Sequence, residues 1–314
     1  MRLLADIGGT NVRFALLPQG SGTPQDELVL QCADYRGLEE AVEYYLDQVG
    51  RPVLTEAAMD VATAITGDFV KLTNSPWAFS IEQARRRLKL NRLLVINDFT
   101  ALALSLPKLQ ADELRKVGRG EGVPGTPIAL LGAGTGLGVS ALIPHGNRWI
   151  TLQGEGGHVA FSAMSEREDD VLRVLRQHHG HVSAERLLSG PGLVNVYRAL
   201  CELAHVVPRN YSPEQVSQAG LRRDDTQCAE TLEIFCAALG TAAANLVVCL
   251  GARAAVYIGG GIVPKLGDYF DRSAFRVRFE HKGRFSSYVA QVPTYVILAQ
   301  TPALRGLAVA LENS

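Results

Sequence analysis

Residues 3–17 read Leu-Leu-Ala-Asp-Ile-Gly-Gly-Thr-Asn-Val-Arg-Phe-Ala-Leu-Leu, which is an apolar run, a glycine turn and a second apolar run. Both runs have the composition of buried strands, so this stretch predicts a β-hairpin. The phosphate loops of Rossmann and Walker-type proteins lead instead from a strand into a helix, and neither consensus occurs in the chain. Any phosphate site in this chain must therefore be of another type.

The same pattern occurs a second time in the middle of the chain. Residues 127–131 (Pro-Ile-Ala-Leu-Leu) lead into the glycine turn 132–138 (Gly-Ala-Gly-Thr-Gly-Leu-Gly), and residues 139–143 form another strand-like run. A segment rich in Gly and Pro at 118–127 precedes this second copy and is a plausible domain boundary. We therefore expect two related halves, each with a glycine hairpin.

Glycine turns of this kind can bind a polyphosphate. Without Cβ atoms their backbone N–H groups approach a phosphate closely, and the hydroxyl groups of Thr10 and Thr135 can add hydrogen bonds. A single turn of this kind more commonly serves only to close a hairpin. Two copies, together with the run Gly259–Gly261 after the apolar residues 254–258, favour a nucleotide site.

Two aspartates are candidates for the chemistry. Asp6, beside the first turn, is placed to hold a hydrated Mg²⁺ ion. Asp98 follows the apolar run 93–96, at a strand end where α/β proteins place functional groups, and it can accept the proton of a hydroxyl nucleophile. The alternative role of Asp98 is the N-cap of the helix that we expect to follow it.

A second group of polar residues suits a sugar. Glu155 and His158 bracket two glycines, so a carboxylate and an imidazole lie close together, as a polyhydroxyl ligand requires. Two ligands are too few for a closed zinc site. We expect a helix that Ser183 caps and Gly190–Pro191 ends, with Glu185 near its start. The alternative role of Glu185 is to compensate the dipole of that helix.

Length and composition indicate the class of protein. The chain has 314 residues, of which 47% are hydrophobic and 20% charged, with a formal net charge of -1. This balance predicts a folded, soluble protein, of two lobes or one large domain, and gives no electrostatic reason to expect a nucleic acid or an anionic membrane as partner. The five cysteines are dispersed without a Cys-x-x-Cys pair, which is typical of reduced thiols in a cytosolic protein.

Two stretches bear on targeting and membrane insertion. The first residues reach a charge too early for a signal peptide, and they leave no room for a DNA-binding helix-turn-helix before the first strand. The uncharged stretch 234–252 contains Gly, Thr and Asn among many Ala residues, so we expect a buried helix and not a membrane span.

Seven motifs, in order over essentially the whole chain, together resemble those of bacterial glucokinases. They are Asp-Ile-Gly-Gly-Thr-Asn (6–11), Ile-Asn-Asp-Phe-Thr-Ala (96–101), Gly-Ala-Gly-Thr-Gly-Leu-Gly (132–138), Gly-Glu-Gly-Gly-His-Val (154–159), Ser-Ala-Glu-Arg (183–186), Leu-Ser-Gly-Pro-Gly-Leu-Val-Asn (188–195) and Gly-Gly-Gly-Ile-Val-Pro (259–264). The zinc-binding cysteine motif of the related repressor/open-reading-frame/kinase sugar kinases is missing. The resemblance implies an α/β, two-lobed actin/hexokinase-like (ribonuclease H-like) fold with a cleft between a small domain, 1–108 plus 302–314, and a large domain, 109–301.

The resemblance also implies an activity and a set of site residues. The reaction would be transfer of the γ-phosphoryl group of ATP to the 6-hydroxyl of D-glucose with Mg²⁺, in a cytoplasmic homodimer. Asp98 would be the base for the 6-hydroxyl, and the other hydroxyls would be held by Asn97, Glu155, His158 and Glu185. The ATP phosphates would be bound by Ala5, Asp6, Ile7, Gly8, Gly9 and Thr10 and by Gly134, Thr135 and Gly136, with Gly259, Gly260 and Gly261 near the adenosine.

Some alternatives remain open at this point. At three positions the chain differs from the residues that are common in relatives, namely Ala5, Ala64 and Ala160. The first two differences put the local loop geometry in question, and none of the three removes a catalytic group. A kinase for another hexose or with another phosphoryl donor fits the same motifs. A non-catalytic sugar sensor is disfavoured by the presence of Asp98, and an actin-like or chaperone-like ATPase by the Glu155, His158 and Glu185 set.

Overall fold

The computed structural model describes residues 1–72 and 75–313, and it divides into two compact units. The first unit comprises Met1–Gln110, His145–Gln153 and Ala299–Ser314, and the second comprises Ala111–Pro144 and Gly154–Leu298. Ser314, the last residue of the predicted segment 302–314, lies outside the described residues. The domain boundaries expected from the sequence stay a prediction.

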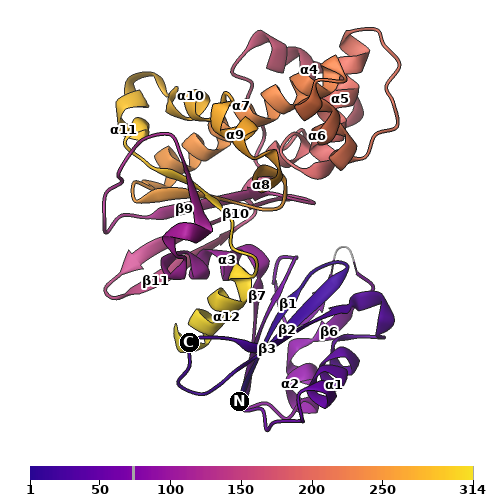
Figure 1. Cartoon of the computed structure of the whole chain (residues 1–314), viewed down its shortest axis with the longest axis vertical. Helices are drawn as coiled ribbons and strands as arrows, with labels where there is room; N and C mark the ends of the chain where they lie inside the picture. The colour runs from indigo at the N-terminus through magenta and orange to yellow at the C-terminus, as the bar shows by residue number, and fades with distance from the viewer. Residues whose placement is uncertain (73–74, 314) are drawn as a thin grey trace. The chain divides into compact units, whose positions relative to one another are not determined.

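The first unit is built on a five-stranded sheet (Figure 1). Its strands, in the order β3-β2-β1-β4-β7, are β3 (Gln25–Gln31), β2 (Asn11–Leu17), β1 (Arg2–Ile7), β4 (Glu56–Val61) and β7 (Arg92–Asn97). Strands β1 and β2 form the predicted antiparallel hairpin, with Ile7 opposite Val12 across the glycine turn. Strands β1, β4 and β7 are parallel, so their carboxyl ends meet at one edge of the sheet.

Side chains along these strands point alternately to the two faces of the sheet. Leu3, Ala57 and Met59 belong to a core closed by α1 (Leu38–Gln48) and α2 (Ile81–Arg87). Beside this core lies a small sheet of β5 (Phe69–Lys71) and β6 (Ala78–Ser80). Ser80 Oγ accepts the Gln83 N–H at 3.0 Å and so caps α2.

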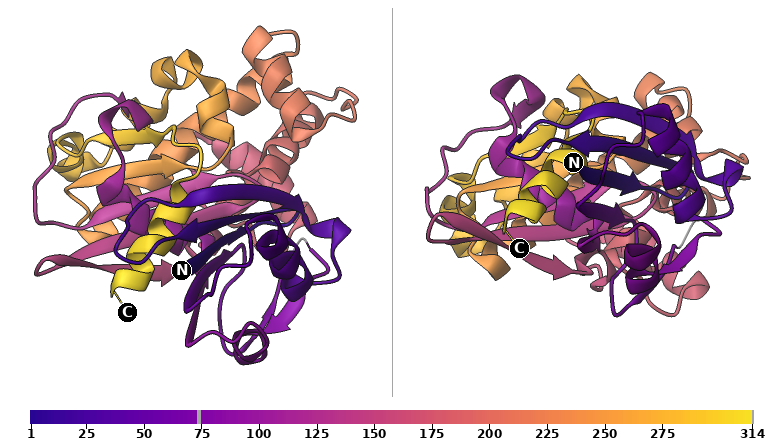
Figure 2. Two further views of the ribbon diagram at one scale, coloured as in Figure 1. Left: turned by 60° about the horizontal axis from the view of Figure 1, so that its bottom comes forward. Right: turned by 90° about the horizontal axis from the view of Figure 1, so that it is seen from below.

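The opposite face is covered by α3 (Asp98–Ser105) and the C-terminal helix α12 (Pro302–Asn313). Helix α12 packs along α3 and beside β1 and β4, although about 200 to 300 residues separate it from them in sequence (Figures 1 and 2). A Cβ atom at Gly306 would lie 1.7 Å from the Ala101 carbonyl oxygen. The two helix backbones therefore touch at a position that only glycine allows.

The second unit repeats the arrangement of the first. The strands of its sheet follow the order β10-β9-β12-β13-β8, with β10 (Leu137–His145), β9 (Ile128–Ala133), β12 (Ala255–Gly259), β13 (Thr294–Ile297) and β8 (Leu114–Val117). Strand β11 (Arg148–Gly154) pairs with β10 in the same sheet, although its residues up to Gln153 are counted with the first unit. An antiparallel β9–β10 hairpin is followed across the sheet by parallel β12 and β13, as β1–β2 is by β4 and β7. The predicted relation between the two halves is confirmed, with β8 as an additional edge strand.

Helices complete the core of the second unit. They are α4 (Glu166–His178), α5 (Gly190–Leu203), α6 (Pro213–Arg222), α7 (Thr226–Leu250), α8 (Ile262–Leu266), α9 (Asp268–Arg272), α10 (Phe275–Glu280) and α11 (Ser286–Ala290). Among the described residues α7 alone is long and apolar enough to cross a membrane, but 67% of its most apolar window is buried inside the protein. It packs against α5, α6 and α10, so the prediction of a buried helix is confirmed.

Candidate functional site

Acidic residues gather at the carboxyl edge of the first sheet. Asp6 lies near the end of β1, Asp98 directly follows β7, and Asp60 lies near the end of β4 between them. Asp60 is absent from the residues predicted from the sequence. The signal that could have found it is a lone charged residue inside the otherwise apolar run 57–61.

Asn97, and not Asp98, caps helix α3. Asn97 Oδ1 accepts the backbone N–H groups of Phe99 at 3.0 Å and Thr100 at 3.4 Å. The alternative role considered for Asp98, the N-cap, is therefore wrong, because the residue before it already supplies the cap. Asp98 is the first residue of the helix, and its Oδ1 accepts Asn97 Nδ2–H at 2.8 Å and the Phe99 N–H at 2.9 Å. Among the described residues no hydrogen bond involves Asp98 Oδ2, which leaves that oxygen for a ligand hydroxyl.

The surroundings of Asp98 suit a base. Burial raises its pKa from 3.8 to about 6, the Phe99 N–H bond opposes the rise, and the charge of Asp6 adds to it. Such a carboxyl group is mostly ionised at pH 7, yet it is a stronger base than an exposed aspartate. It can accept the proton of an alcohol that attacks a phosphoryl group.

Asp6 lies in a row of charged groups across three strands. It pairs in register with Arg13 on β2 and with Asp60 on β4. Burial raises the pKa of Asp6, while the neighbouring Asp60 carboxyl group and the charge of Arg13 lower it. Asp60 is completely buried, and burial together with the charges of Asp6 and Asp98 raises its pKa well above 3.8.

The first glycine turn presents backbone rather than side chains. Ala5 and Ile7 are buried in the sheet, so only their backbone groups can reach a ligand. The Gly8 N–H closes the turn on the Asn11 carbonyl oxygen at 2.9 Å, while Thr10 is exposed. A Cβ at Gly8 would lie 3.2 Å from that carbonyl, which favours glycine at this position.

The second glycine turn joins β9 to β10 and is fixed by α5. The Gly134 N–H donates to the Gly136 carbonyl at 2.9 Å, and the Gly134 carbonyl accepts the Gly190 N–H at 2.8 Å. Gly190 is the first residue of α5, so the prediction that Gly190–Pro191 ends a helix is wrong. Ser189 caps α5 through the Gly192 N–H at 3.0 Å, and a proline in the first helical turn costs no hydrogen bond.

Glu185 contacts the second glycine turn directly. It lies on a single 3₁₀ turn, Ala184–Arg186, at whose start Ser183 makes no side-chain capping bond, contrary to the prediction. Glu185 Oε2 accepts the Leu137 N–H at 2.9 Å, and a Cβ at Gly136 would lie 2.6 Å from the same oxygen. A three-residue turn has little dipole to compensate, so the carboxylate instead fixes the second glycine turn.

Glu155 and His158 flank another short turn, Gly156–His158, which follows β11. The His158 N–H donates to the Glu155 carbonyl at 3.0 Å, and Gly157 lies so near β10 that a Cβ there would be 2.1 Å from the Leu137 carbonyl. Both side chains are exposed.

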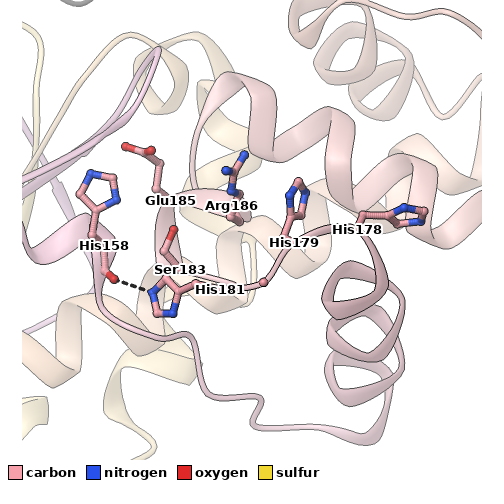
Figure 3. A pocket seen from close by; sticks show the side chains of 8 residues that line it. His158, His178, His179, His181, Ser183, Glu185 and Arg186 are labelled. Atoms are coloured by element: carbon pink, nitrogen blue, oxygen red, sulfur yellow. Dashed lines mark hydrogen bonds between the residues drawn. The ribbon is translucent and has the colours of Figure 1, made fainter.

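His158 and Glu185 share a pocket of about 420 Å³ (Figure 3). The His158 carbonyl is bonded to His181 Nε2 at 2.9 Å, and Figure 3 shows the Glu185 carboxylate on the same side of the pocket as the His158 ring. The other lining residues are His178, His179, Gly180, Ser183 and Arg186. The turn of Glu155 and His158 and the turn of Glu185 thus meet beside the second glycine turn.

The third glycine run lies next to the second turn. Gly259, the last residue of β12, pairs with Gly132 on β9. Gly260 has a φ of +80°, and a Cβ there would lie 2.3 Å from the Ala133 carbonyl oxygen, whereas a Cβ at Gly261 would meet nothing. The predicted nucleotide residues of the second unit are therefore neighbours.

The carboxyl edge of the first sheet also suits Mg²⁺. Its available groups are carboxylate oxygens, and Asp60 has two buried oxygens without a donor among the described residues. The described residues contain no group of three or more His, Cys, Asp or Glu arranged to hold a metal. Mg²⁺ commonly keeps its waters and binds one or two carboxylates together with substrate phosphates, so Asp6 fits an ion held through water.

These features define a class of protein: a two-domain actin-like kinase with a glycine hairpin in each of its two units. A family profile described as Glucokinase matches residues 3–314, and the chain belongs to the glucokinase family, which phosphorylates glucose with ATP. It is 51% identical over 314 residues to the glucokinase of Aromatoleum aromaticum, covering 100% of this chain and 95% of the relative. It is 52% identical over 312 residues to that of Chromobacterium violaceum, covering 99% and 89%.

A solved structure supports the same conclusion. The crystal structure of a glucokinase from an Antarctic psychrotroph superposes with a TM-score of 0.90 at 33% identity, covering 100% of this chain and 99% of that one. The predicted actin/hexokinase-like α/β fold and the predicted glucokinase activity are confirmed.

Proposed function

We propose that Asp98 is the general base of this glucokinase and that Asn97 orients it. Asn97 caps α3 and donates to Asp98 Oδ1, so the second carboxylate oxygen is directed to the glucose 6-hydroxyl. The raised pKa of Asp98 makes this oxygen a competent proton acceptor near neutral pH. The proposal rests on one observation above all: Asn97, and not Asp98, is the N-cap of helix α3.

The other sugar hydroxyls are held in the second unit. Glu155 and Glu185 accept hydrogen bonds from hydroxyls, and His158 donates or accepts according to its tautomer. Because Glu185 Oε2 also accepts the Leu137 N–H, the same carboxylate contacts both the sugar and the phosphate turn. Glucose binding and the geometry of the second glycine turn are thereby linked.

The phosphates of ATP are bound by backbone N–H groups of the two glycine turns, from Ala5 to Thr10 and from Gly134 to Gly136. Gly259, Gly260 and Gly261 allow the adenosine to lie against backbone. Asp6 would hold Mg²⁺ through water, and the ion would neutralise phosphate charge. The chain's own residues then have to align the 6-hydroxyl with the γ-phosphoryl group and exclude water as a competing acceptor.

A coupled assay of ADP release over a panel of hexoses tests this function. We expect glucose to be the preferred acceptor, and ATP to be preferred over other phosphoryl donors at equal concentration. An enzyme that binds glucose without sugar-dependent ADP release would contradict the kinase assignment and indicate a sugar sensor. We further propose a cytoplasmic homodimer with no nucleic acid or membrane partner. Light scattering would measure the mass in solution.

A further inference from the structure

Trp77 is a large buried side chain that carries a hydrogen-bond donor. It is 1% exposed and lies in the core of the first unit together with Tyr45 and Phe79. Its indole N–H donates to the carbonyl oxygens of Cys32 and Tyr35, both at 3.1 Å. An apolar side chain could fill the core without needing an acceptor, so the donor of Trp77 indicates a role beyond packing.

The small sheet of the first unit fixes the position of Trp77. Trp77 directly precedes β6, and its carbonyl oxygen accepts the N–H of Leu72, the residue after β5, at 3.1 Å. Val70 on β5 pairs with Phe79 on β6, and both side chains lie in the same core as Trp77. The indole is therefore held by a packed element and does not depend on the loop that it contacts.

Cys32 connects the indole to the first glycine turn. It directly follows β3 and is 1% exposed. Its N–H donates to the Thr10 carbonyl oxygen at 2.8 Å, and its thiol donates to the Gly8 carbonyl oxygen at 3.7 Å. The thiol is a weak donor, so the backbone bond is the stronger of the two. The residue that accepts the Trp77 N–H thus holds carbonyl groups on both sides of Gly9.

This arrangement determines where the N–H of Gly9 points. In a planar trans peptide the carbonyl of one residue and the N–H of the next point in opposite directions. The Gly8 carbonyl faces the Cys32 thiol, so the N–H of Gly9 faces away from it. Among the described residues no hydrogen bond uses the N–H of Gly9 or of Thr10. Both donors are therefore available to a phosphate group.

We propose that Trp77 is a positioning residue for ATP: through Cys32 its indole N–H holds the first glycine turn in the conformation that presents the Gly9 N–H to the phosphates. This inference rests on the phosphate-binding role of that turn in the proposed function. Glycine leaves the backbone of the turn many accessible conformations, so contacts from outside the turn have to select one of them. A turn that is already ordered binds its ligand more tightly, because less conformational entropy is lost on binding.

Two matched variants separate this role from packing. Trp77→Phe removes the indole N–H and keeps an aromatic ring in the core. The control is Tyr45→Phe, since Tyr45 is also fully buried and its hydroxyl donates to the Asp26 carbonyl oxygen at 2.9 Å, near the start of β3. Each variant loses one buried aromatic donor to backbone carbonyl oxygen, but only Trp77 bonds to the end of the segment that contacts the glycine turn.

Three measurements report on the turn. The KM values for ATP and glucose come from coupled ADP release. Competitive inhibition by adenosine measures the part of the nucleotide site that involves no phosphate, which the proposed function places at Gly259–Gly261. Hydrogen exchange of residues 6–11, measured by mass spectrometry, reports the order of the turn without catalysis.

We expect Trp77→Phe to raise the KM for ATP about 3–10-fold and to exchange faster at residues 6–11, because the turn loses one of its constraints. The KM for glucose and the inhibition constant of adenosine should stay within about twofold of the wild type, since neither ligand contacts this turn. Tyr45→Phe should lower the Tm and leave all three constants and the exchange of the turn unchanged.

Two results would overturn the inference. One is a wild-type KM for ATP in Trp77→Phe, and the other is an equal rise of that KM in Tyr45→Phe, which would mean that any loosening of the core has the same effect. If Trp77→Phe does not fold, Cys32→Ala decides, because it removes only the thiol contact with Gly8; unchanged exchange of residues 6–11 in that variant would contradict the inference.

The phosphate-binding role of the turn is tested separately. Thr10 is exposed, so Thr10→Asp should fold and should raise the KM for ATP by about 10-fold or more through repulsion between like charges. An unchanged KM for ATP in Thr10→Asp would refute the role of the turn itself. A raised KM in Thr10→Asp with a wild-type KM in Trp77→Phe would refute only the role of Trp77.

Discussion

Replacing Asp98 by Asn removes the proposed base with little change of shape. The amide oxygen of the replacement can still accept the Phe99 N–H, and Asn97 still caps α3. A general base contributes about 10²–10⁴-fold to the rate, so we expect kcat to fall by that factor while the Kd for glucose changes little. Turnover is measured by coupled ADP release and glucose binding by calorimetry.

The pH dependence gives an independent check of the same assignment. With a pKa of about 6 for Asp98, wild-type kcat should rise through an acid limb centred near pH 6 and level off above pH 7. The residual activity of Asp98→Asn should lack this limb. A control, Asp47→Asn, removes an exposed carboxylate from α1 and should leave the profile unchanged.

Stability should change in the opposite direction to activity. Because the folded-state pKa lies above 3.8, the wild type loses stability as pH rises from about 4 through about 6. The difference between 3.8 and about 6 corresponds to at most about 3 kcal/mol. Asp98→Asn should therefore be more stable than the wild type at pH 8, and the difference should vanish near pH 4. Near-wild-type turnover by this variant, or an acid limb that it retains, would refute the assignment of Asp98 as base.

Three further outcomes are expected. Gly260→Ala should lose about 2 kcal/mol or more of unfolding free energy in urea titrations, because Gly260 has a positive φ and lies against the Ala133 backbone. The control Gly261→Ala should lose little, because a Cβ there meets no neighbouring atom. Equal losses in the two variants would contradict the requirement for glycine at position 260. Glu185→Ala should raise the KM for both glucose and ATP by about 10-fold or more, because it also leaves the Leu137 N–H without its acceptor. An unchanged KM for ATP would argue against the proposed link between glucose binding and the second glycine turn. His158→Ala should weaken glucose binding in calorimetry and leave the KM for ATP unchanged; parallel losses would indicate misfolding.

The features predicted correctly from the sequence are those that local composition determines. The two hairpins follow from apolar runs on either side of glycine, and their repetition predicted the duplicated sheet. Asp98 lies directly after a strand, as the apolar run before it indicated, and its role as base stays a prediction.

The errors concern residues whose role depends on distant parts of the chain. Gly190–Pro191 has the composition of a helix end, but Ser189 before it and the carbonyl of Gly134 make it a helix start. The alternative role of Glu185, compensation of a helix dipole, does not hold, because its carboxylate accepts the N–H of Leu137, 48 residues away in sequence. Asp60 acquires its significance only when β4 is placed between β1 and β7, and sequence periodicity alone does not reveal strand order.

The packing of α12 along α3 has a consequence for the order in which the protein can form during synthesis. The first strands leave the ribosome early, but one face of their sheet is covered by a helix whose residues, 302–313, are made about 200 residues after Asp98. The second unit has all of its strands and helices once residue 298 has been made. We expect the second unit to fold first, although domains generally fold from the N-terminal end. The half that carries the proposed base would then form last, so we expect a chain still attached to the ribosome to expose the apolar face around Leu4 and to be unable to turn over its substrate.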